Sequence, residues 1–200
     1  MKKRVLSAMP SQTFAEGALD AVQQTGELSY DGYKKVWSDE FNGDSLNRAD
    51  WNVETHEKGW VNNELQEYVD SAENIQVKDG KLIINPVKKV TDGDTGSTKE
   101  IASYTSGRVS IQNKQTFIYG RFECRAKVPK GQGTLAYPAP FDQPFYIILN
   151  LAVGGSWVGN PNDETSFENN PYVIDYVRVY RKDSYDEDVK RPGKISLVMS

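Results

Sequence analysis

The residues from about 36 to 181 follow a pattern of short strands and tight turns almost without interruption. Apolar and polar residues alternate in four clear runs, at 81–85, 108–111, 119–128 and 172–180. Turn-forming pairs such as Asn42-Gly43 and Asp79-Gly80 separate strands, because Gly, Asn and Asp tolerate the backbone angles of tight turns. This pattern predicts an all-β domain, with a sandwich or jelly roll favoured. The lack of a fixed repeat period disfavours a propeller or a β-helix.

The two ends of the chain do not show this pattern. Residues 1–35 begin with MKKR, but Pro10 interrupts the apolar run that a secretory signal needs, and at most a short amphipathic helix follows. Residues 182–200 mix charges with Pro192 and Gly193 and have no sustained period. We therefore expect three regions: a linker or the end of a preceding module at 1–35, one β domain at 36–181, and a C-terminal linker at 182–200.

Composition limits the functions open to this domain. The 200 residues are 38% hydrophobic, enough to bury a core, and carry 24 basic and 28 acidic side chains for a net charge of -4. This balance argues against a nucleic-acid partner, and no apolar run reaches the roughly 20 residues of a membrane span. The single cysteine, Cys124, shares one face of an expected strand with Phe122 and Ala126, so we expect a buried, chemically inert thiol.

Five stretches of the chain resemble, in the same order, strands of the family 16 glycoside hydrolases, the laminarinase and lichenase type of β-glucanase. They are VWSDEFNGDSLNRADWNVE, WVNNELQEYVDSAENIQVKDGKLIINPVKK, the run from YTSGRVS to KVPKGQG, PFDQPFYIILNLAVGGSWVGNP and YVIDYVRVYRK. Each stretch alone is a weak signal, but five in the family's order argue against chance. The resemblance implies a concanavalin A-like β-sandwich, or jelly roll, whose concave face binds and cuts a β-glucan chain.

The catalytic groups that this resemblance implies are missing. The family carries them in an ExDxxE pattern on one strand, and retaining hydrolysis needs two carboxyl groups about 5 Å apart. The pattern does not occur in this chain, and only residues 134–140 stand where the catalytic strand is expected. The recognisable span is also short for a sandwich of about 200 to 250 residues, so roughly 50 to 100 residues are lacking. We predict a sandwich that is incomplete after Gly133 and has no catalytic residues.

No other group of residues offers a substitute catalytic centre. Glu64 and Glu67 are three apart, so they would face opposite sides of a strand. The acids at 163–164 and 186–188 fall in polar, turn-like stretches. His56, the only histidine, has no metal-ligand or triad partner at a suitable spacing, and we expect a loop residue.

Substrate contacts are expected on strands that remain. Aromatic residues are abundant, with 4 Trp, 11 Tyr and 7 Phe, and such rings either fill a core or stack on sugars. The resemblance implies sugar-binding roles for Trp60, Asn63, Arg108, Asn150 and Trp157. Amide and guanidinium donors beside flat apolar rings suit a neutral, hydroxyl-rich chain. The alternatives are that the two Asn side chains bond backbone in turns and that the two Trp side chains belong to the core.

A structural metal site is expected around Asp175. Alternation places this carboxylate on one face with Val177 and Val179, which is costly unless the acid is paired or metal-bound. The resemblance implies Ca²⁺ at Glu40, the Gly80 carbonyl and Asp175, and hard oxygen ligands suit that ion. An ion pair with Arg or Lys on a neighbouring strand is the alternative.

Three functions therefore compete. The resemblance implies that the chain is a family 16 endo-β-1,3- or 1,3-1,4-glucanase by descent. We expect this chain to be inactive, because it lacks the catalytic strand. The alternatives are a non-catalytic β-glucan-binding module and a fragment without a function of its own. A β-glucan polysaccharide or oligosaccharide is the expected partner, Ca²⁺ the expected structural ion, and no organic cofactor is expected. The substrate class predicts an extracellular location, although no signal segment is visible in the chain.

Overall fold

The computed structural model describes residues 29–91, 101–129, 145–157, 159–163 and 165–184. The chain divides into two units, Met1–Asp31 and Gly32–Ser200, and nearly all of the first lies outside the described residues. The expected junction at 134–140, and most of the expected linkers at 1–35 and 182–200, also lie outside them. None of the described segments forms a helix that is long and apolar enough to cross a membrane.

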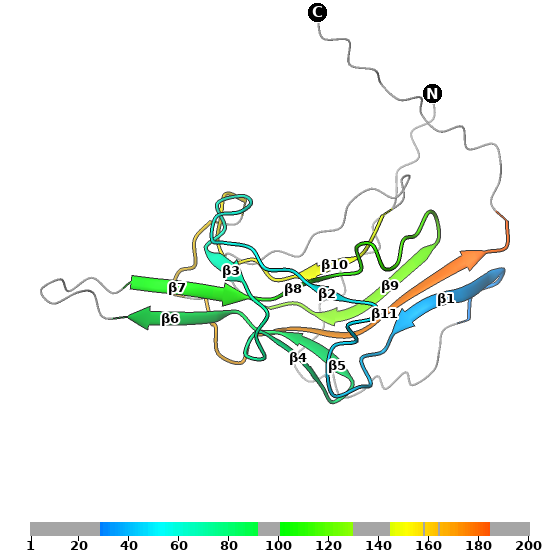
Figure 1. Cartoon of the computed structure of the whole chain (residues 1–200), viewed down its shortest axis with the longest axis horizontal. Helices are drawn as coiled ribbons and strands as arrows, with labels where there is room; N and C mark the ends of the chain where they lie inside the picture. Colours follow the sequence, from blue (N-terminus) through cyan, green and yellow to red (C-terminus); the bar gives the residue numbers. More distant parts are fainter. Residues whose placement is uncertain (1–28, 92–100, 130–144, 158, 164, 185–200) are drawn as a thin grey trace, which may run out of the picture. The chain divides into compact units, whose positions relative to one another are not determined.

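The described part of the second unit consists of strands and turns, which confirms the predicted all-β class (Figure 1). Its strands are β1 (Tyr33–Asp39), β2 (Asn52–Val53), β3 (Gln66–Tyr68), β4 (Ile75–Lys78), β5 (Lys81–Ile84), β6 (Val87–Thr91), β7 (Ile101–Ser106), β8 (Arg108–Ser110), β9 (Arg121–Lys127), β10 (Ile148–Asn150) and β11 (Tyr172–Lys182). The turn between β4 and β5 is the expected Asp79-Gly80 pair, and both residues have positive φ angles.

The largest sheet, sheet A, is organised around β11. One edge of β11 pairs with β9, from Val173 opposite Lys127 to Tyr180 opposite Arg121. The other edge pairs with β5 near the start of β11 and with β1 near its end, and β4 extends the sheet beyond β5. Most residues of β11 are β-branched or aromatic, side chains that favour a pleated, half-buried strand.

A bulge in β11 changes the face on which Asp175 lies. The register shifts between Ile174 and Tyr176, so Ile174 and Val177 are both buried although they are three residues apart. Asp175 therefore does not share a face with Val177 and Val179, and the predicted apolar stripe around this carboxylate is wrong. Alternation read from the sequence could not reveal the bulge, because one extra residue exchanges the two faces beyond it.

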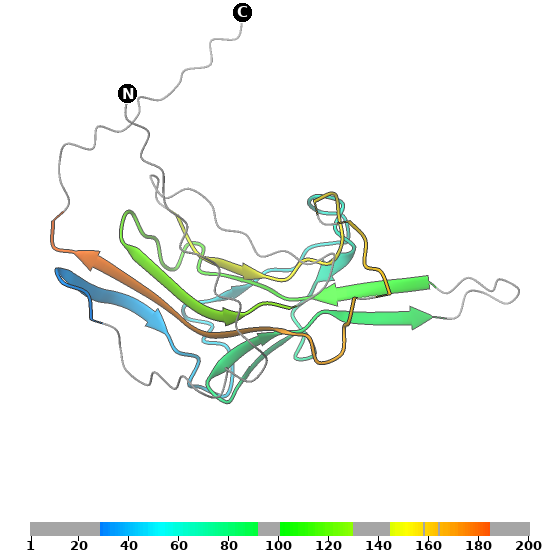
Figure 2. The same ribbon diagram turned by 180° about the vertical axis from the view of Figure 1, so that it is seen from behind.

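Two smaller sheets complete the unit (Figure 2). In sheet B, β8 lies between β2 and β10 and is antiparallel to both. In sheet C, β7 pairs antiparallel with β6 and parallel with β3. Gly107 joins β7 to β8, and a Cβ at this position would lie 2.6 Å from Ile75 Cγ1 and 3.1 Å from Ile84 Cγ2. The chain therefore passes from sheet C to sheet B too close to the core for any side chain.

The core lies between sheets A and B. Apolar side chains of β5, β8, β10 and β11 fill it, and Trp51 is completely buried just before β2. The Trp51 indole N–H donates to Asp39 Oδ2 at 2.8 Å, so the buried ring keeps a hydrogen-bond partner. The Trp37 and Phe117 rings pack nearby with centroids 6.0 Å apart. Two sheets around a shared core confirm the predicted sandwich.

Both sheets of the sandwich end in a strand with one unpaired edge, as far as the described residues go. There, β9 pairs only with β11, and β10 pairs only with β8. The register places Phe122, Cys124 and Ala126 on the same side of sheet A as the buried residues of β11. Cys124 is nevertheless exposed, so the prediction of a buried thiol is wrong.

Candidate functional site

Sheet B turns a row of polar side chains away from the core. Val53, Val109 and Leu149 pack against the core, and the residues that alternate with them point to the opposite face. These outward residues, called the polar face below, are Asn52, Glu54, Arg108, Ser110 and Asn150. The strand register places Asn150 opposite Arg108 and Asn52 opposite Ser110.

An ion pair occupies the centre of the polar face. Arg108 Nε donates to Glu54 Oε2 at 2.6 Å, and the two side chains are only 14% and 18% exposed. His56 Nε2 lies 3.3 Å from the same oxygen. Burial by itself raises the pKa of Glu54, but the Ser110 hydroxyl and the Arg108 guanidinium outweigh burial and hold it below its ordinary value. Glu54 is therefore an ionised carboxylate that already has a cationic partner.

Trp60 forms an aromatic wall beside this ion pair. The His56 and Trp60 rings stack with centroids 3.5 Å apart and planes 7° from parallel. The guanidinium carbon of Arg108 lies 5.3 Å from the Trp60 centroid, within the range of a cation–π contact. Trp60 nonetheless remains 52% exposed, so part of its ring is open to a ligand. The alternative of a core role for Trp60 is excluded.

Tyr68 links Asn150 to the loop that carries Trp60. Asn150 Nδ2 donates to the Tyr68 hydroxyl at 2.8 Å, and that hydroxyl donates to Glu64 Oε2 at 3.3 Å. Gln66 Nε2 donates to the same Glu64 oxygen at 2.8 Å. Burial, together with the nearby Glu64 charge, raises the pKa of Tyr68, so its hydroxyl stays protonated. Asn150 thus bonds a side chain, and the alternative that it bonds backbone in a turn does not hold.

Two loops close one end of the polar face. Asn63 Nδ2 donates to Ser156 Oγ at 3.1 Å, and the Ser156 N–H donates to the Asn62 carbonyl at 2.7 Å. Gly155 allows this approach, because a Cβ there would lie 2.8 Å from the same carbonyl. Trp157 follows on the second loop and is 61% exposed. The predicted residues Trp60, Asn63, Arg108, Asn150 and Trp157 therefore lie on paired strands and joined loops, and their roles in sugar binding stay predictions.

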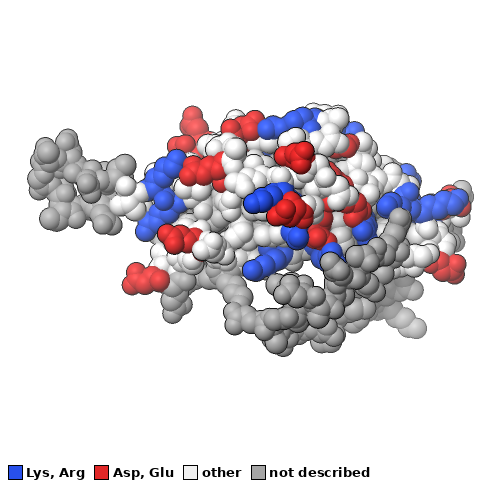
Figure 3. Space-filling view, turned by 90° about the horizontal axis from the view of Figure 1, so that it is seen from below, with Lys and Arg blue, Asp and Glu red and all other residues white. Residues whose placement is uncertain are grey.

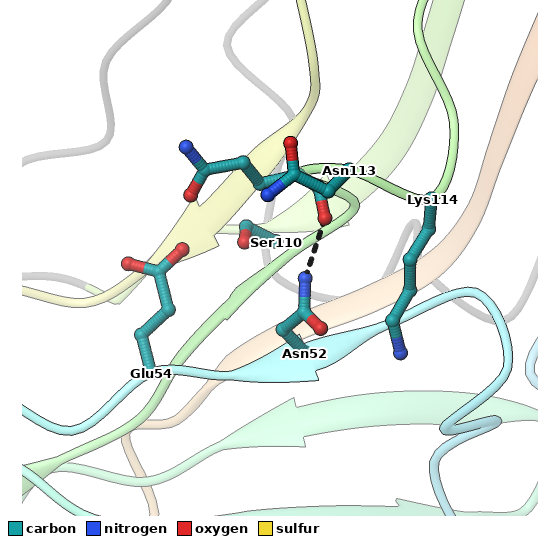
Figure 4. A pocket seen from close by; sticks show the side chains of 6 residues that line it. Asn52, Glu54, Ser110, Asn113 and Lys114 are labelled. Carbon is teal, nitrogen blue, oxygen red and sulfur yellow. Dashed lines mark hydrogen bonds between the residues drawn. The ribbon is translucent and has the colours of Figure 1, made fainter.

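The polar face opens into a hollow of about 390 Å³ (Figure 4). Its lining residues are Asn52, Glu54, Ser110, Gln112, Asn113 and Lys114. Asn52 Nδ2 donates to the Gln112 carbonyl at 2.8 Å, while Lys114 points away from Glu54 and donates to the Trp51 carbonyl at 3.0 Å. Every lining side chain can donate or accept a hydrogen bond, so the hollow suits a polar, hydroxylated ligand rather than an apolar one.

Sequence reasoning missed Glu54, His56 and Tyr68. The expectation of an unpartnered loop position for His56 is wrong, because His56 forms a β-bridge with Tyr68 and contacts both Glu54 and Trp60. The spacing Glu-x-His was an available signal, since residues two apart on an extended chain share a face. Arg108, the partner of Glu54, lies fifty-four residues away in the sequence, so only the folded chain could identify it.

The carboxylates expected to bind Ca²⁺ each contact an arginine. Two guanidinium nitrogens of Arg178 donate to Glu40 at 2.8 and 2.7 Å, and this hydrogen bonding lowers the pKa of Glu40. Arg125 contacts Asp175, and Gly80 lies in the turn between β4 and β5. No cluster of three or more His, Cys, Asp or Glu side chains suited to a metal ion occurs in the described segments. Figure 3, the view from below Figure 1, shows basic and acidic side chains interspersed on that face of the molecule.

Comparison with known proteins shows which proteins the chain resembles. No family model matches the chain. A glucan endo-1,3-β-glucosidase A1 of Niallia circulans is 34% identical over 139 residues, which are 64% of this chain and 19% of that protein. The structure of an endo-β-1,3-glucanase from Pyrococcus furiosus superposes with a TM-score of 0.63 and 24% identity, covering 76% of this chain and 96% of that one. The resemblance to glycoside hydrolase family 16 is confirmed.

A further family 16 comparison bears on the predicted deficit. A β-glucanase of Rhodothermus marinus is 25% identical over 254 residues, which cover 74% of this chain and 85% of that protein. The alignment is 254 positions long, but only 74% of the 200 residues of this chain take part in it. About 106 positions of the alignment are therefore gaps in this chain. The predicted deficit after Gly133 stays a prediction. The chain spans only about a fifth of the length of the Niallia circulans protein.

Proposed function

We propose that this chain binds β-glucan through the polar face and Trp60 and does not hydrolyse it. The observation that carries the proposal is the grouping of Trp60, Arg108 and Asn150. The Arg108 guanidinium contacts the partly exposed Trp60 ring, and Arg108 pairs with Asn150 across the sheet. The flat apolar surface of Trp60 therefore lies beside guanidinium and amide groups. Sugar rings offer an apolar C–H face and a rim of hydroxyl groups, which such a surface matches. The glucanase names of the relatives favour a β-1,3- or mixed-linked glucan.

The absence of hydrolysis follows from the carboxyl groups. A retaining mechanism needs a nucleophile and a proton donor about 5 Å apart, and the donor needs a raised pKa. The chain has no ExDxxE pattern, and Glu54, the carboxylate nearest Trp60 on the polar face, has a lowered pKa and is paired with Arg108. Glu64 accepts hydrogen bonds from Gln66 and Tyr68. Glu54 is therefore not suited to protonating a glycosidic oxygen.

Calcium binding and an extracellular location belong to the same proposal. The Gly80 turn lies close to Asn42, since a Cβ at Gly80 would be 3.6 Å from Asn42 Oδ1, and this brings the turn near the segment that carries Glu40. A Ca²⁺ ion there would have to compete with Arg125 for Asp175. β-Glucan polymers occur outside cells, and a protein that binds them would act there.

Affinity electrophoresis on laminarin tests the binding. Laminarin in the gel should retard the chain, and Trp60→Ala should abolish the retardation by removing the stacking surface. Trp157→Ala should weaken the retardation, and Val36→Ala, which trims another exposed apolar side chain on β1, should leave it unchanged. Equal migration of a folded chain with and without laminarin would reject glucan binding and favour a fragment without function.

A reducing-end assay on laminarin and lichenan tests the absence of hydrolysis. We expect no release of reducing ends above that of a blank purification. Turnover that co-purifies with the chain and is lost in Glu54→Gln or Glu64→Gln would refute the proposal, because it would show that one of these carboxylates is catalytic. Chain that is insoluble or lacks a cooperative melting transition would support the fragment instead.

A further inference from the structure

His56 is held in one orientation by contacts of its backbone and of its ring. Its N–H donates to the Tyr68 carbonyl at 3.0 Å and its carbonyl accepts from the Tyr68 N–H at 2.9 Å, which ties this segment to β3. Nε2 of the ring lies 3.3 Å from Glu54 Oε2, and the Tyr68 ring packs edge-on with its centroid 6.3 Å away. The His56 side chain is only 23% exposed. The imidazole therefore has little freedom to turn.

Trp60 takes its own orientation from this imidazole. Its N–H donates to the Glu57 carbonyl at 3.2 Å, and the Gly59 N–H donates to the Glu64 carbonyl at 3.0 Å, so the loop backbone is closed by hydrogen bonds. The Trp60 residue is nevertheless 52% exposed. The His56 ring lies parallel to the indole, with centroids 3.5 Å apart and planes 7° from parallel. The stack covers one face of the indole and fixes the direction of the other.

We propose that His56 is a positioning residue for glucan binding, which holds the Trp60 ring as a flat surface with one face left for a sugar. The inference rests on the proposed function, because it explains how Trp60 is prepared for the glucan chain. Binding costs less free energy when the side chain that receives the ligand is already ordered, since less rotamer freedom is lost on contact. A fixed indole also keeps a constant geometry with the Arg108 guanidinium beside it.

The flat ring of His56, rather than its nitrogen, carries this role. Glu54 Oε2 already accepts a hydrogen bond from Arg108 Nε at 2.6 Å, so the carboxylate keeps a cationic partner when the imidazole is removed. The parallel contact with the Trp60 indole needs another flat ring. An aromatic pair contributes a free energy that corresponds to about 2- to 12-fold in an equilibrium constant. Substitution of His56 should therefore act on glucan binding through the loss of the ring.

Three substitutions at His56 separate the ring from the nitrogen. Calorimetric titration with laminarihexaose, a soluble β-1,3-glucan oligosaccharide, gives the dissociation constant of each variant. His56→Gln and His56→Leu should raise this constant about fivefold, because both lose the ring. His56→Phe should stay within about twofold of the unsubstituted chain, because it keeps a ring. Tyr33→Leu is the control, since it removes a ring on β1 that contacts Lys182 in sheet A, and it should leave the constant unchanged.

NMR relaxation of the Trp60 indole N–H measures the positioning without any glucan. The Trp60 signal is the one of four indole signals that disappears in Trp60→Phe. We expect an order parameter of about 0.85 in the unsubstituted chain and in His56→Phe, and below about 0.6 in His56→Gln and His56→Leu. A general loss of stability would not free this one ring, so the pattern would assign the weaker binding to the lost stack.

Equal loss of affinity in His56→Phe and His56→Gln would overturn the proposal, because it would assign the role to the nitrogen that contacts Glu54. An indole order parameter that is the same in all variants would also overturn it, as would a loss of order that leaves the dissociation constant unchanged. If the unsubstituted chain does not bind laminarihexaose, the proposed function is refuted instead, and the order parameters alone decide whether His56 positions Trp60. If His56→Gln does not fold, His56→Leu makes the same comparison.

Discussion

Removal of the Arg108 charge should destabilise the β unit strongly, because it leaves Glu54 without its cation. The two side chains are 14% and 18% exposed and their atoms are 2.6 Å apart, so the pair is closer to a buried ion pair than to a surface one. Loss of one partner costs about 3–5 kcal/mol in buried pairs and about 0–1 kcal/mol at the surface. For Arg108→Met, which keeps an apolar stem, we expect a loss of about 3 kcal/mol in unfolding free energy. That loss corresponds to a fall in Tm of roughly 6–12 °C for a domain of this size.

A double-mutant cycle separates the ion pair from the other contacts of Arg108. Glu54→Gln should cost about 2 kcal/mol, because it leaves Arg108 unpaired, and the double variant should cost about 3 kcal/mol rather than the sum. Urea unfolding followed by tryptophan fluorescence gives all four free energies. The expected coupling is about 2 kcal/mol, and additivity within about 0.5 kcal/mol would refute the assignment of Glu54 and Arg108 as an energetically coupled pair.

Three further predictions concern backbone packing, pH and metal. Gly107→Ala should lower the free energy of unfolding by about 2 kcal/mol, because the new Cβ would overlap Ile75 and Ile84. Gly43→Ala, where the closest neighbour of the new Cβ is 3.5 Å away, should be nearly neutral. Equal urea midpoints for the two variants would contradict this prediction. The pKa values of Glu40 and Glu54 are lowered from 4.5 in the folded chain, so their stabilisation is present above about pH 4.5 and is lost as the pH falls through the folded pKa values. Glu54→Gln should therefore lose less stability on acidification than the unsubstituted chain, and parallel stability curves would disprove the linkage. Ca²⁺ at Glu40, Gly80 and Asp175 should raise Tm, and a Tm that is the same in Ca²⁺ and in EGTA would reject the metal proposal.

The broad fold could be predicted because strand alternation and turn residues are local properties. The run at 172–180 became β11, and Asp79-Gly80 became the turn between β4 and β5, since each depends only on neighbouring residues. The bulge at Ile174 could not be predicted in this way. Its position depends on how β11 pairs with β9, and it moved Asp175 off the core-facing side.

The sequence could predict those residues of the candidate site that the family pattern supplied. It could not predict contacts between side chains that are distant in the sequence. Trp60, Arg108 and Asn150 were expected and lie around one face, because the strands that carry them are present. The contacts of His56 with Glu54 and Trp60 came only from the folded chain. The role of a histidine cannot be assigned from the sequence alone, because its neighbours in space decide its tautomer and charge.

The sequence by itself determined that residues 36–181 read as an all-β domain and that the chain has no ExDxxE carboxylate pair, because both depend on the residues alone. Tertiary structure alone decided that Glu54 is held by Arg108, fifty-four residues away, and that Cys124 is exposed on a strand with apolar neighbours. The physical reason is the same for both. Charge state and burial are set by groups that lie close in space, and in a sandwich of antiparallel strands the residues closest in space are often distant in the chain.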